Sequence, residues 1–158
     1  TELAQPVTTL PVSAVKGFRE DKPFGVGEMG RSVYTPEDLA ELKKDSEYPI
    51  IEFANITLMF PEPEEAKGAG AYPFPIGGKN YALGRLNVAK MAYSQTFKRL
   101  ATYGQLRGPE DPPFNVFWEL ESISIDGKVT YYAPSLRQKD TEEKPDPEVI
   151  AFIKQFTQ

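Results

Sequence analysis

Two segments rich in proline and glycine limit where regular structure can form in this chain. Residues 1–34 show neither the 3.6-residue period of a helix nor the 2-residue period of a strand. Residues 61–79 contain prolines and glycines at eight positions, a composition typical of a long loop. We therefore expect an irregular N-terminal arm over residues 1–34 and a single domain over residues 35–158.

The segments outside these two regions predict both helices and strands. Thr35 and Pro36 are suited to the N-cap and first position of a helix, and Leu39 and Leu42 supply its apolar face. The other expected elements are a strand from Tyr48 to Phe60, a long helix over about 81–103, a hairpin from Phe114 to Tyr132 and a helix over about 147–156, after the first helix over about 36–45. This order predicts an α+β fold in which a small antiparallel sheet packs against one long and two shorter helices.

The apolar alternation is interrupted within two of the expected strands. It changes phase at Ala54-Asn55 and again near Glu121-Ser122. An extra residue in one strand of an antiparallel pair produces such a change, so we expect a bulged sheet.

The chain has no histidine and no cysteine. It therefore lacks the side chains of Ser-His-Asp and Cys-His nucleophiles, of imidazole bases and of nearly all zinc and haem sites. We expect no metal site and no cofactor. Any catalysis must use carboxylates, lysine, tyrosine or hydroxyl groups.

The charge and the apolar pattern also restrict the partners. The formal net charge is −5, and the basic residues form only pairs, which disfavours nucleic acid. No stretch approaches the roughly 18 apolar residues of a membrane span. The first residue is Thr1 and cysteine is absent, so the expected location is secreted or periplasmic, after removal of a targeting peptide.

Glu119 and Glu121 are the best candidates for acid–base catalysis. They are two residues apart on an expected strand, so they share one face at a Cα separation of about 6–7 Å. Such a pair is compatible with a carboxylate-based hydrolase. The alternative is a solvent-exposed glutamate face on an antiparallel strand.

A second candidate site follows the sequence Gly77-Gly78-Lys79-Asn80. If a helix begins here, its free amide groups together with Lys79 and Arg85 offer a site for a small anion. A glycine-rich turn followed by a solvated lysine is the alternative interpretation.

Aromatic residues supply the remaining candidate binding sites. Tyr72 and Phe74 alternate with prolines, which favours a stiff extended segment that loses little entropy on docking. Trp118, Tyr131 and Tyr132 lie in the expected hairpin and could form a stacking surface for a ligand or part of the core.

The sequence therefore leads to two hypotheses of different classes. The preferred one is a non-catalytic protein–protein interaction protein, such as a complex subunit, an accessory factor or an inhibitor. It would contact another protein through the arm and the loop over residues 61–79. The alternative is a cavity protein, either a small-molecule binder or a hydrolase that uses Glu119 and Glu121.

Overall fold

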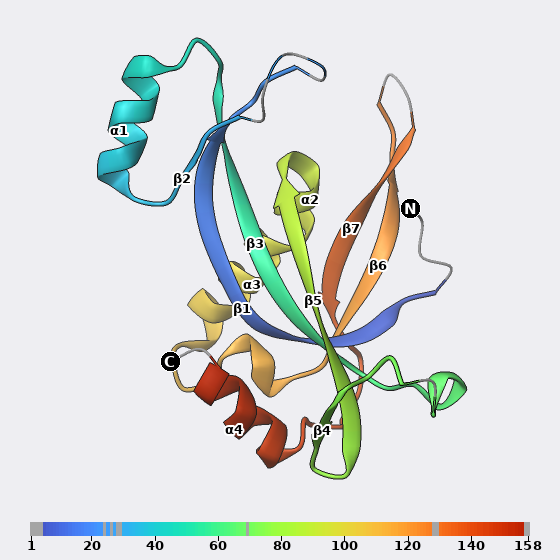
Figure 1. Cartoon of the computed structure of the whole chain (residues 1–158). Helices are drawn as coiled ribbons and strands as arrows, with labels where there is room; N and C mark the ends of the chain where they lie inside the picture. The colour runs from blue at the N-terminus through green and yellow to red at the C-terminus, as the bar shows by residue number, and fades with distance from the viewer. Residues whose placement is uncertain are drawn as a thin grey trace.

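The computed structural model describes residues 5–23, 25, 27, 30–68, 70–127 and 130–156. Its centre is a seven-stranded antiparallel sheet in the order β4-β5-β3-β1-β6-β7, with the short strand β2 pairing with β1 (Figure 1). The expected α+β class with an antiparallel sheet is confirmed. The strands are β1 (Val7–Glu20), β2 (Ser32–Val33), β3 (Ile50–Pro61), β4 (Phe74–Ile76), β5 (Lys79–Ala89), β6 (Trp118–Ile125) and β7 (Tyr131–Gln138).

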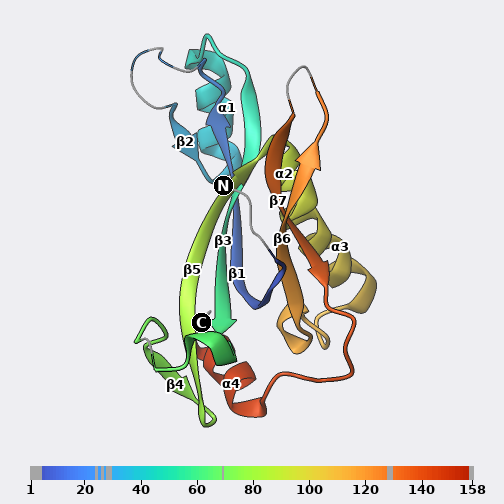
Figure 2. The same ribbon diagram turned by 90° about the vertical axis from the view of Figure 1, so that its right-hand side faces the viewer.

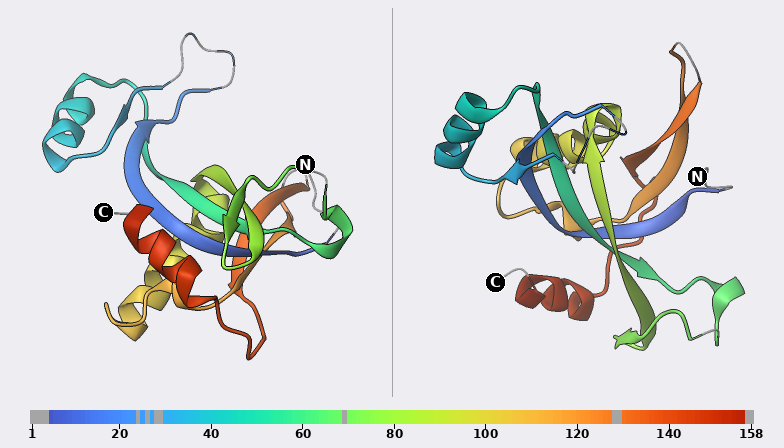
Figure 3. Two further views of the ribbon diagram at one scale, coloured as in Figure 1. Left: turned by 60° about the horizontal axis from the view of Figure 1, so that its bottom comes forward. Right: turned by 45° about the horizontal axis from the view of Figure 1, so that its top comes forward.

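Strand β1 connects all parts of the sheet. One of its edges pairs with β3 from Leu10 to Glu20. Among the described residues, the other edge pairs with β6 at residues 7–9 and with β2 at residues 18 and 19. Figure 3 shows β1 curving through the molecule, so that the β6–β7 hairpin diverges from β3 and β5.

The bend of β1 coincides with a bulge. The register against β3 shifts between Pro11 and Ser13, which leaves one extra residue in β1. The pairing of β3 with β5 and of β6 with β7 is continuous through Ala54-Asn55 and Glu121-Ser122. The sheet is bulged as expected, but the bulge lies in a different strand from the two that the sequence predicted.

The expected irregular arm needs correction, because residues 7–20 form the central strand. Leu10 and Val12 are buried, and proline is accepted at position 11 because it lies beside the bulge. The bulge shifts the alternation of apolar residues by one position, which is why the sequence showed no period of two. Residues 1–4 lie outside the described part of the chain.

The expected long helix over 81–103 is also wrong in its first half. Gly77 and Gly78 have φ angles of 59° and 82°, which is the backbone of a two-residue hairpin turn between β4 and β5. The chain therefore continues as strand β5 to Ala89. Helix begins only at α2 (Lys90–Gln95) and continues after a bend as α3 (Phe97–Arg107).

Helices α2 and α3 cover the inner face of the bent sheet (Figure 2). Helix α2 contacts β3, β5 and β7, so it lies between the two diverging parts of the sheet. The main core consists of inward residues of four strands and of both helices. Its buried members are Ala54, Ile56, Leu58, Val88, Tyr93, Leu100, Tyr103, Val116, Trp118, Leu120 and Leu136.

On the outer face of the sheet, α4 (Pro147–Phe156) covers the lower part. Val149 and Ile153 of α4 are fully buried against Leu10, Met59 and Tyr81. Phe114 and Phe117, in and after the 3-10 helix η2 (Pro113–Asn115), complete this second core. The upper part of the outer face has no helix of the described chain over it (Figure 1).

The two shorter expected helices are confirmed within a residue of their predicted bounds. In α1 (Pro36–Asp45) the Thr35 hydroxyl accepts a hydrogen bond of 3.1 Å from the Asp38 amide. Leu42 is buried. The 3-10 helix η1 (Glu64–Ala66) lies in the loop that follows β3.

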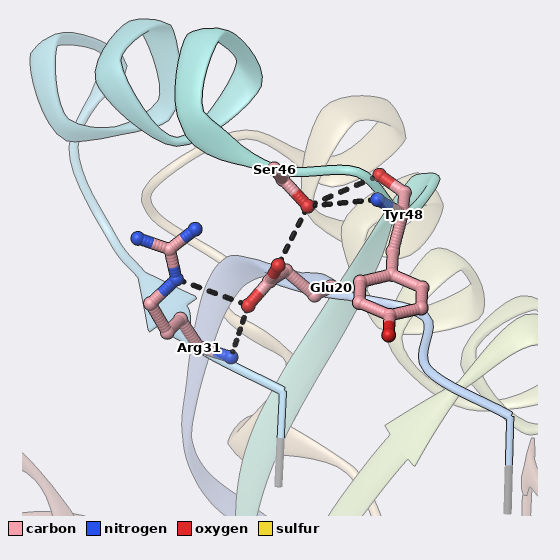
Figure 4. A network of polar contacts seen from close by, with 4 residues as sticks. All are labelled: Glu20, Arg31, Ser46 and Tyr48. Carbon is pink, nitrogen blue, oxygen red and sulfur yellow. Dashed lines mark hydrogen bonds and ion pairs between the residues drawn. The ribbon is translucent and has the colours of Figure 1, made fainter. Parts of the chain in front are cut away.

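The end of β1 is tied to α1 and β2 by one carboxylate (Figure 4). Glu20 accepts hydrogen bonds from the Ser46 hydroxyl at 2.6 Å and from the backbone amide and Nε of Arg31 at 2.9 and 3.1 Å. These bonds lower the pKa of Glu20 from 4.5 to about 2, and the bond from Ser46 has the largest effect. Glu20 thus holds the long connection between β1 and β3 against the end of the sheet.

This lowered pKa predicts a pH-dependent contribution to stability. The ionised form is favoured in the folded state, so the stabilisation is fully present above pH 4.5 and is lost as the pH falls towards about 2. We expect Glu20→Gln to lower the Tm at neutral pH, and the difference from the wild type to shrink between pH 4.5 and 2. Thermal denaturation across this range measures it. Glu41→Gln on the exposed side of α1 is the control, and an equal effect of both substitutions would contradict the assignment.

Candidate functional site

The upper part of the outer sheet face, over which no described helix lies, carries a group of mostly polar side chains from three neighbouring strands and from the residue after β2. Because alternate residues share a face and the strands are in register, residues far apart in sequence lie side by side here. Asn55 is directly opposite Val15 on one side and Asn87 on the other. We call this group the polar face; it comprises Val15 and Arg19 of β1, Tyr34 after β2, Asn55 of β3, and Arg85 and Asn87 of β5.

A chain of hydrogen bonds orders most of the polar face. Arg19 Nη1 donates to Asn87 Oδ1 at 2.7 Å, and Asn87 Nδ2 donates to Asn55 Oδ1 at 2.8 Å. Asn55 Nδ2 then donates to the Tyr34 hydroxyl at 3.5 Å. All three bonds are exposed to solvent. The orientation of each amide is thereby fixed before any ligand arrives.

The aromatic rings of Phe53 and Tyr34 pack against each other beside this network. The guanidinium of Arg19 lies 5.3 Å from the centre of the Phe53 ring, and Tyr34 meets the same ring edge-on at 5.7 Å. Glycine at position 17 makes room for this packing, since a Cβ there would lie 2.7 Å from Phe53 Cε1 and 3.0 Å from Tyr34 Cδ1. Phe53 is buried beneath, whereas Tyr34 is 52% exposed.

The polar face is locally positive although the protein is acidic. The outward positions of β1, β3 and β5 in this region include Arg19 and Arg85 and no aspartate or glutamate. Arg85 is exposed and makes no ion pair with a described residue. The arrangement therefore offers an accessible guanidinium, oriented amides and an exposed ring to a ligand lying flat on the sheet.

A second feature is an apolar cleft of about 450 Å³ beside the bulge of β1. Its walls come from β1, from α3 and from η2. The lining residues are Pro11, Val12, Ser13, Ala14, Phe97, Leu100, Ala101, Gly104, Pro113 and Phe114. None of them is ionisable, so this cleft offers shape and apolar contact rather than acid–base chemistry.

Glu119 and Glu121 do share one face of β6, as their spacing predicted, but both contact the same arginine. Arg137 of β7 lies 3.4 Å from a carboxylate oxygen of each, through its Nη2 and Nε atoms. Both side chains lie outside the apolar cleft. The pair is arranged as a cross-strand ion-pair group.

Lys79 and Arg85 are not brought together at a helix start. Both belong to strand β5, so the helix amides needed for the expected anion site do not occur there. Lys79 begins the strand and lies 4.0 Å from Glu143, whereas Arg85 lies six residues further along on the polar face.

The five aromatic candidates lie in three different places. Trp118 is 3% exposed, donates to the Pro113 carbonyl and packs edge-on against Tyr103, so it belongs to the core. Tyr131 and Tyr132 are 46% and 50% exposed at the far end of the hairpin. Phe74 belongs to β4 and pairs with Tyr81, and Tyr72 is half-buried just before it.

Sequence reasoning identified Arg85 and missed the other members of the polar face. Arg19 and Tyr34 lay in the segment expected to be irregular, and Asn87 lay in the expected long helix. For Asn87 the sequence did contain a signal: polar Arg85 and Asn87 alternate with apolar Leu86 and Val88, which fits a half-buried strand.

No family model, curated protein or solved structure shows a significant match to this chain. Among the described residues no helix combines the length and the apolar character required to cross a membrane. The function must therefore be inferred from the residues and geometry of the chain itself.

The close approach at Gly17 gives a test of the ring packing under the polar face. We expect Gly17→Ala to lower stability by about 1–3 kcal/mol, because the added methyl group collides with Phe53 and Tyr34. Gly104→Ala is the matched control, since a Cβ there meets no atom within 4 Å and alanine favours a helix by about 0.5–1 kcal/mol. Denaturant unfolding measures both. Equal destabilisation by the two substitutions would contradict this packing.

Proposed function

We propose that the protein is a non-catalytic binding protein whose polar face binds single-stranded nucleic acid. The observation that carries the proposal is the hydrogen-bonded row from Arg19 through Asn87 and Asn55 to Tyr34, with the exposed Arg85 beside it. This row lies on an open face of the sheet, where a polymer has access along its length.

The connectivity of the strands supports this proposal. The five main strands follow one another as β1, β3, β5, β6 and β7, with β1 pairing with both β3 and β6 and with the helices α2 and α3 between β5 and β6. This arrangement resembles the partly open, five-stranded Greek-key barrel of the OB-fold, in which the face of the second and third strands binds oligonucleotides or oligosaccharides. In this chain those strands are β3 and β5, which hold Asn55, Arg85 and Asn87. The likeness is one of fold and is used as an analogy.

The charge of the face favours a nucleic acid over an oligosaccharide. Two guanidinium groups without a neighbouring carboxylate on the same face attract phosphates, whereas a neutral sugar gains little from them. The net charge of −5 predicted the opposite, but phosphate contacts act within a Debye length of about 8 Å, so the local charge of the face governs them.

The uncharged groups of the face match the bases. The exposed ring of Tyr34 can stack on a base, which contributes about 1–3 kcal/mol in single-strand binding proteins. The amides of Asn55 and Asn87 carry both donors and acceptors, which suits the edges of unpaired bases. Val15 is 51% exposed and lies beside Asn55, on the side away from Asn87, where it adds apolar contact.

Binding of a fluorescent oligothymidylate of about 20 nucleotides, followed by anisotropy at low salt, tests the proposal. We expect Arg85→Gln to weaken binding about five-fold or more and to reduce the slope of log K against log salt by about 0.7, the value for one phosphate contact on a single strand. Lys144→Gln removes the same charge from the exposed linker before α4 and should change neither quantity.

The stacking role of Tyr34 has its own test in the same assay. Tyr34→Ala should weaken binding by roughly ten-fold while the salt slope stays the same, because stacking releases no counterion. A wild-type protein that does not bind the oligonucleotide at low salt, or one whose binding is unaffected by both Arg85→Gln and Tyr34→Ala, would disprove the proposed function.

A protein partner is the second candidate function, and the apolar cleft favours it. The expected contact through an irregular N-terminal arm no longer applies, because that segment is strand β1. The hydrolase alternative is less supported, since Glu119 and Glu121 share one arginine and lie apart from the cleft.

A further inference from the structure

We propose that the open edge of β1 and the apolar cleft beside it form a docking site for an extended peptide segment of a partner protein. The segment would add a short strand to β1 over residues 14–17 and insert one apolar side chain into the cleft. The backbone edge of β1 and the cleft adjoin the polar face at Val15 but use other atoms, so the inference does not depend on nucleic-acid binding.

The first observation is an unpaired stretch of strand edge. On the side away from β3, β1 pairs with β6 at residues 7–9 and with β2 at residues 18 and 19. Between these two contacts no described strand pairs with β1 on that side. Figure 1 shows this edge of β1 facing outward, between β2 above and the α3–η2 region below.

The direction of the backbone groups follows from a hydrogen bond at the end of the strand. The Glu20 amide donates to the Arg31 carbonyl at 3.1 Å, across the same edge. Backbone groups of alternate residues in a strand point to the same side, and the register with β3 is continuous from Ser13 to Glu20. The N–H and C=O groups of Ala14 and Lys16 therefore point to the open edge, where a further strand would bond them.

The second observation is that the apolar cleft adjoins this edge. Pro11 to Ala14 form one of its walls, and Phe97, Ala101 and Gly104 of α3 are part of the opposite wall. A volume of about 450 Å³ accommodates a large aliphatic or aromatic side chain. A peptide strand running beside Ala14 would place a side chain over the cleft without any change of the fold.

The edge also lacks the protection that natural sheets commonly use. An exposed lysine often guards an edge strand against pairing. In β1 the ammonium group of Lys16 is 2.9 Å from Glu52 on the neighbouring strand β3 and 5.3 Å from the centre of the Phe18 ring. Its charge is therefore neutralised on the side away from the open edge.

These features together select an extended peptide over a small apolar molecule. A small molecule would satisfy the cleft alone and leave the backbone groups of Ala14 and Lys16 unused. A peptide in strand addition uses both, since its main chain supplies hydrogen bonds and one side chain supplies specificity. The open window over residues 14–17 matches a contact of about four to six peptide residues at a strand rise of about 3.3 Å.

The test uses capped hexapeptides in which one leucine, isoleucine, phenylalanine or tryptophan is flanked by threonine and serine. Amide NMR of the full chain measures binding, with the Ala14 and Lys16 amides as reporters. For the tightest peptide, N-methylation at alternate residues of one parity should weaken binding at least about ten-fold, because it removes hydrogen bonds to β1. Methylation at the other parity should change it little.

Cleft-filling substitutions test the side-chain contact. Gly104→Leu and Ala101→Leu should each weaken the same peptide about ten-fold or more, because both residues line the cleft. Thr102→Leu places the same side chain at the neighbouring exposed position of α3, outside the cleft lining, and should have no effect. The Tm of each variant shows that it is folded, and oligothymidylate binding should be unchanged in all three, which separates this site from the polar face.

Three results would overturn the inference. They are the absence of binding by every peptide at millimolar concentration, equal affinity after N-methylation at either parity, and equal affinity after both cleft-filling substitutions. Binding of 1-octanol in the cleft without binding of any peptide would assign the cleft to a small apolar ligand instead.

Discussion

The bend of β1 is the constraint on which the other parts of the structure depend. One strand pairs with β3 along most of its length and with β6 only at its first residues, so the sheet must turn sharply between the two contacts. The extra residue between Pro11 and Ser13 permits that turn. The turn creates the space that α2 and α3 fill on the inner side, and it leaves the cleft between α3 and β1, next to the open edge of β1.

The sequence predicted the elements whose signals are local. The cap at Thr35 and the apolar residues of β3 are signals from neighbouring residues, and the helix and the strand that they predicted are present. The sequence failed to predict the elements whose conformation depends on pairing with a strand far away in the sequence. Strand β5 has residues that are compatible with a helix, and only the paired glycines before it, together with pairing to β3, make it a strand. The bulge in β1 hid its period for the same reason, because its cause is the geometry of the whole sheet.

The polar face was even harder to predict from the sequence, because its residues come from distant segments of the chain. Arg19 and Asn87 are 68 residues apart in sequence and share a hydrogen bond of 2.7 Å. Their contact follows from the register of three strands, which no single sequence window contains. Net charge was misleading for a related reason. It sums the whole chain, whereas a ligand on the sheet experiences the few side chains within a screening length of about 8 Å.

Both proposals concern binding, and the geometry of the two surfaces is compatible with it. Catalysis gains most from charges held in a site that excludes water, where electrostatic interactions are strong. The polar face is open and its hydrogen bonds are exposed, while the apolar cleft contains no ionisable side chain among its lining residues. The carboxylates that could act as acid and base, Glu119 and Glu121, are instead paired with Arg137. These carboxylates and the apolar cleft therefore lie in different parts of the fold.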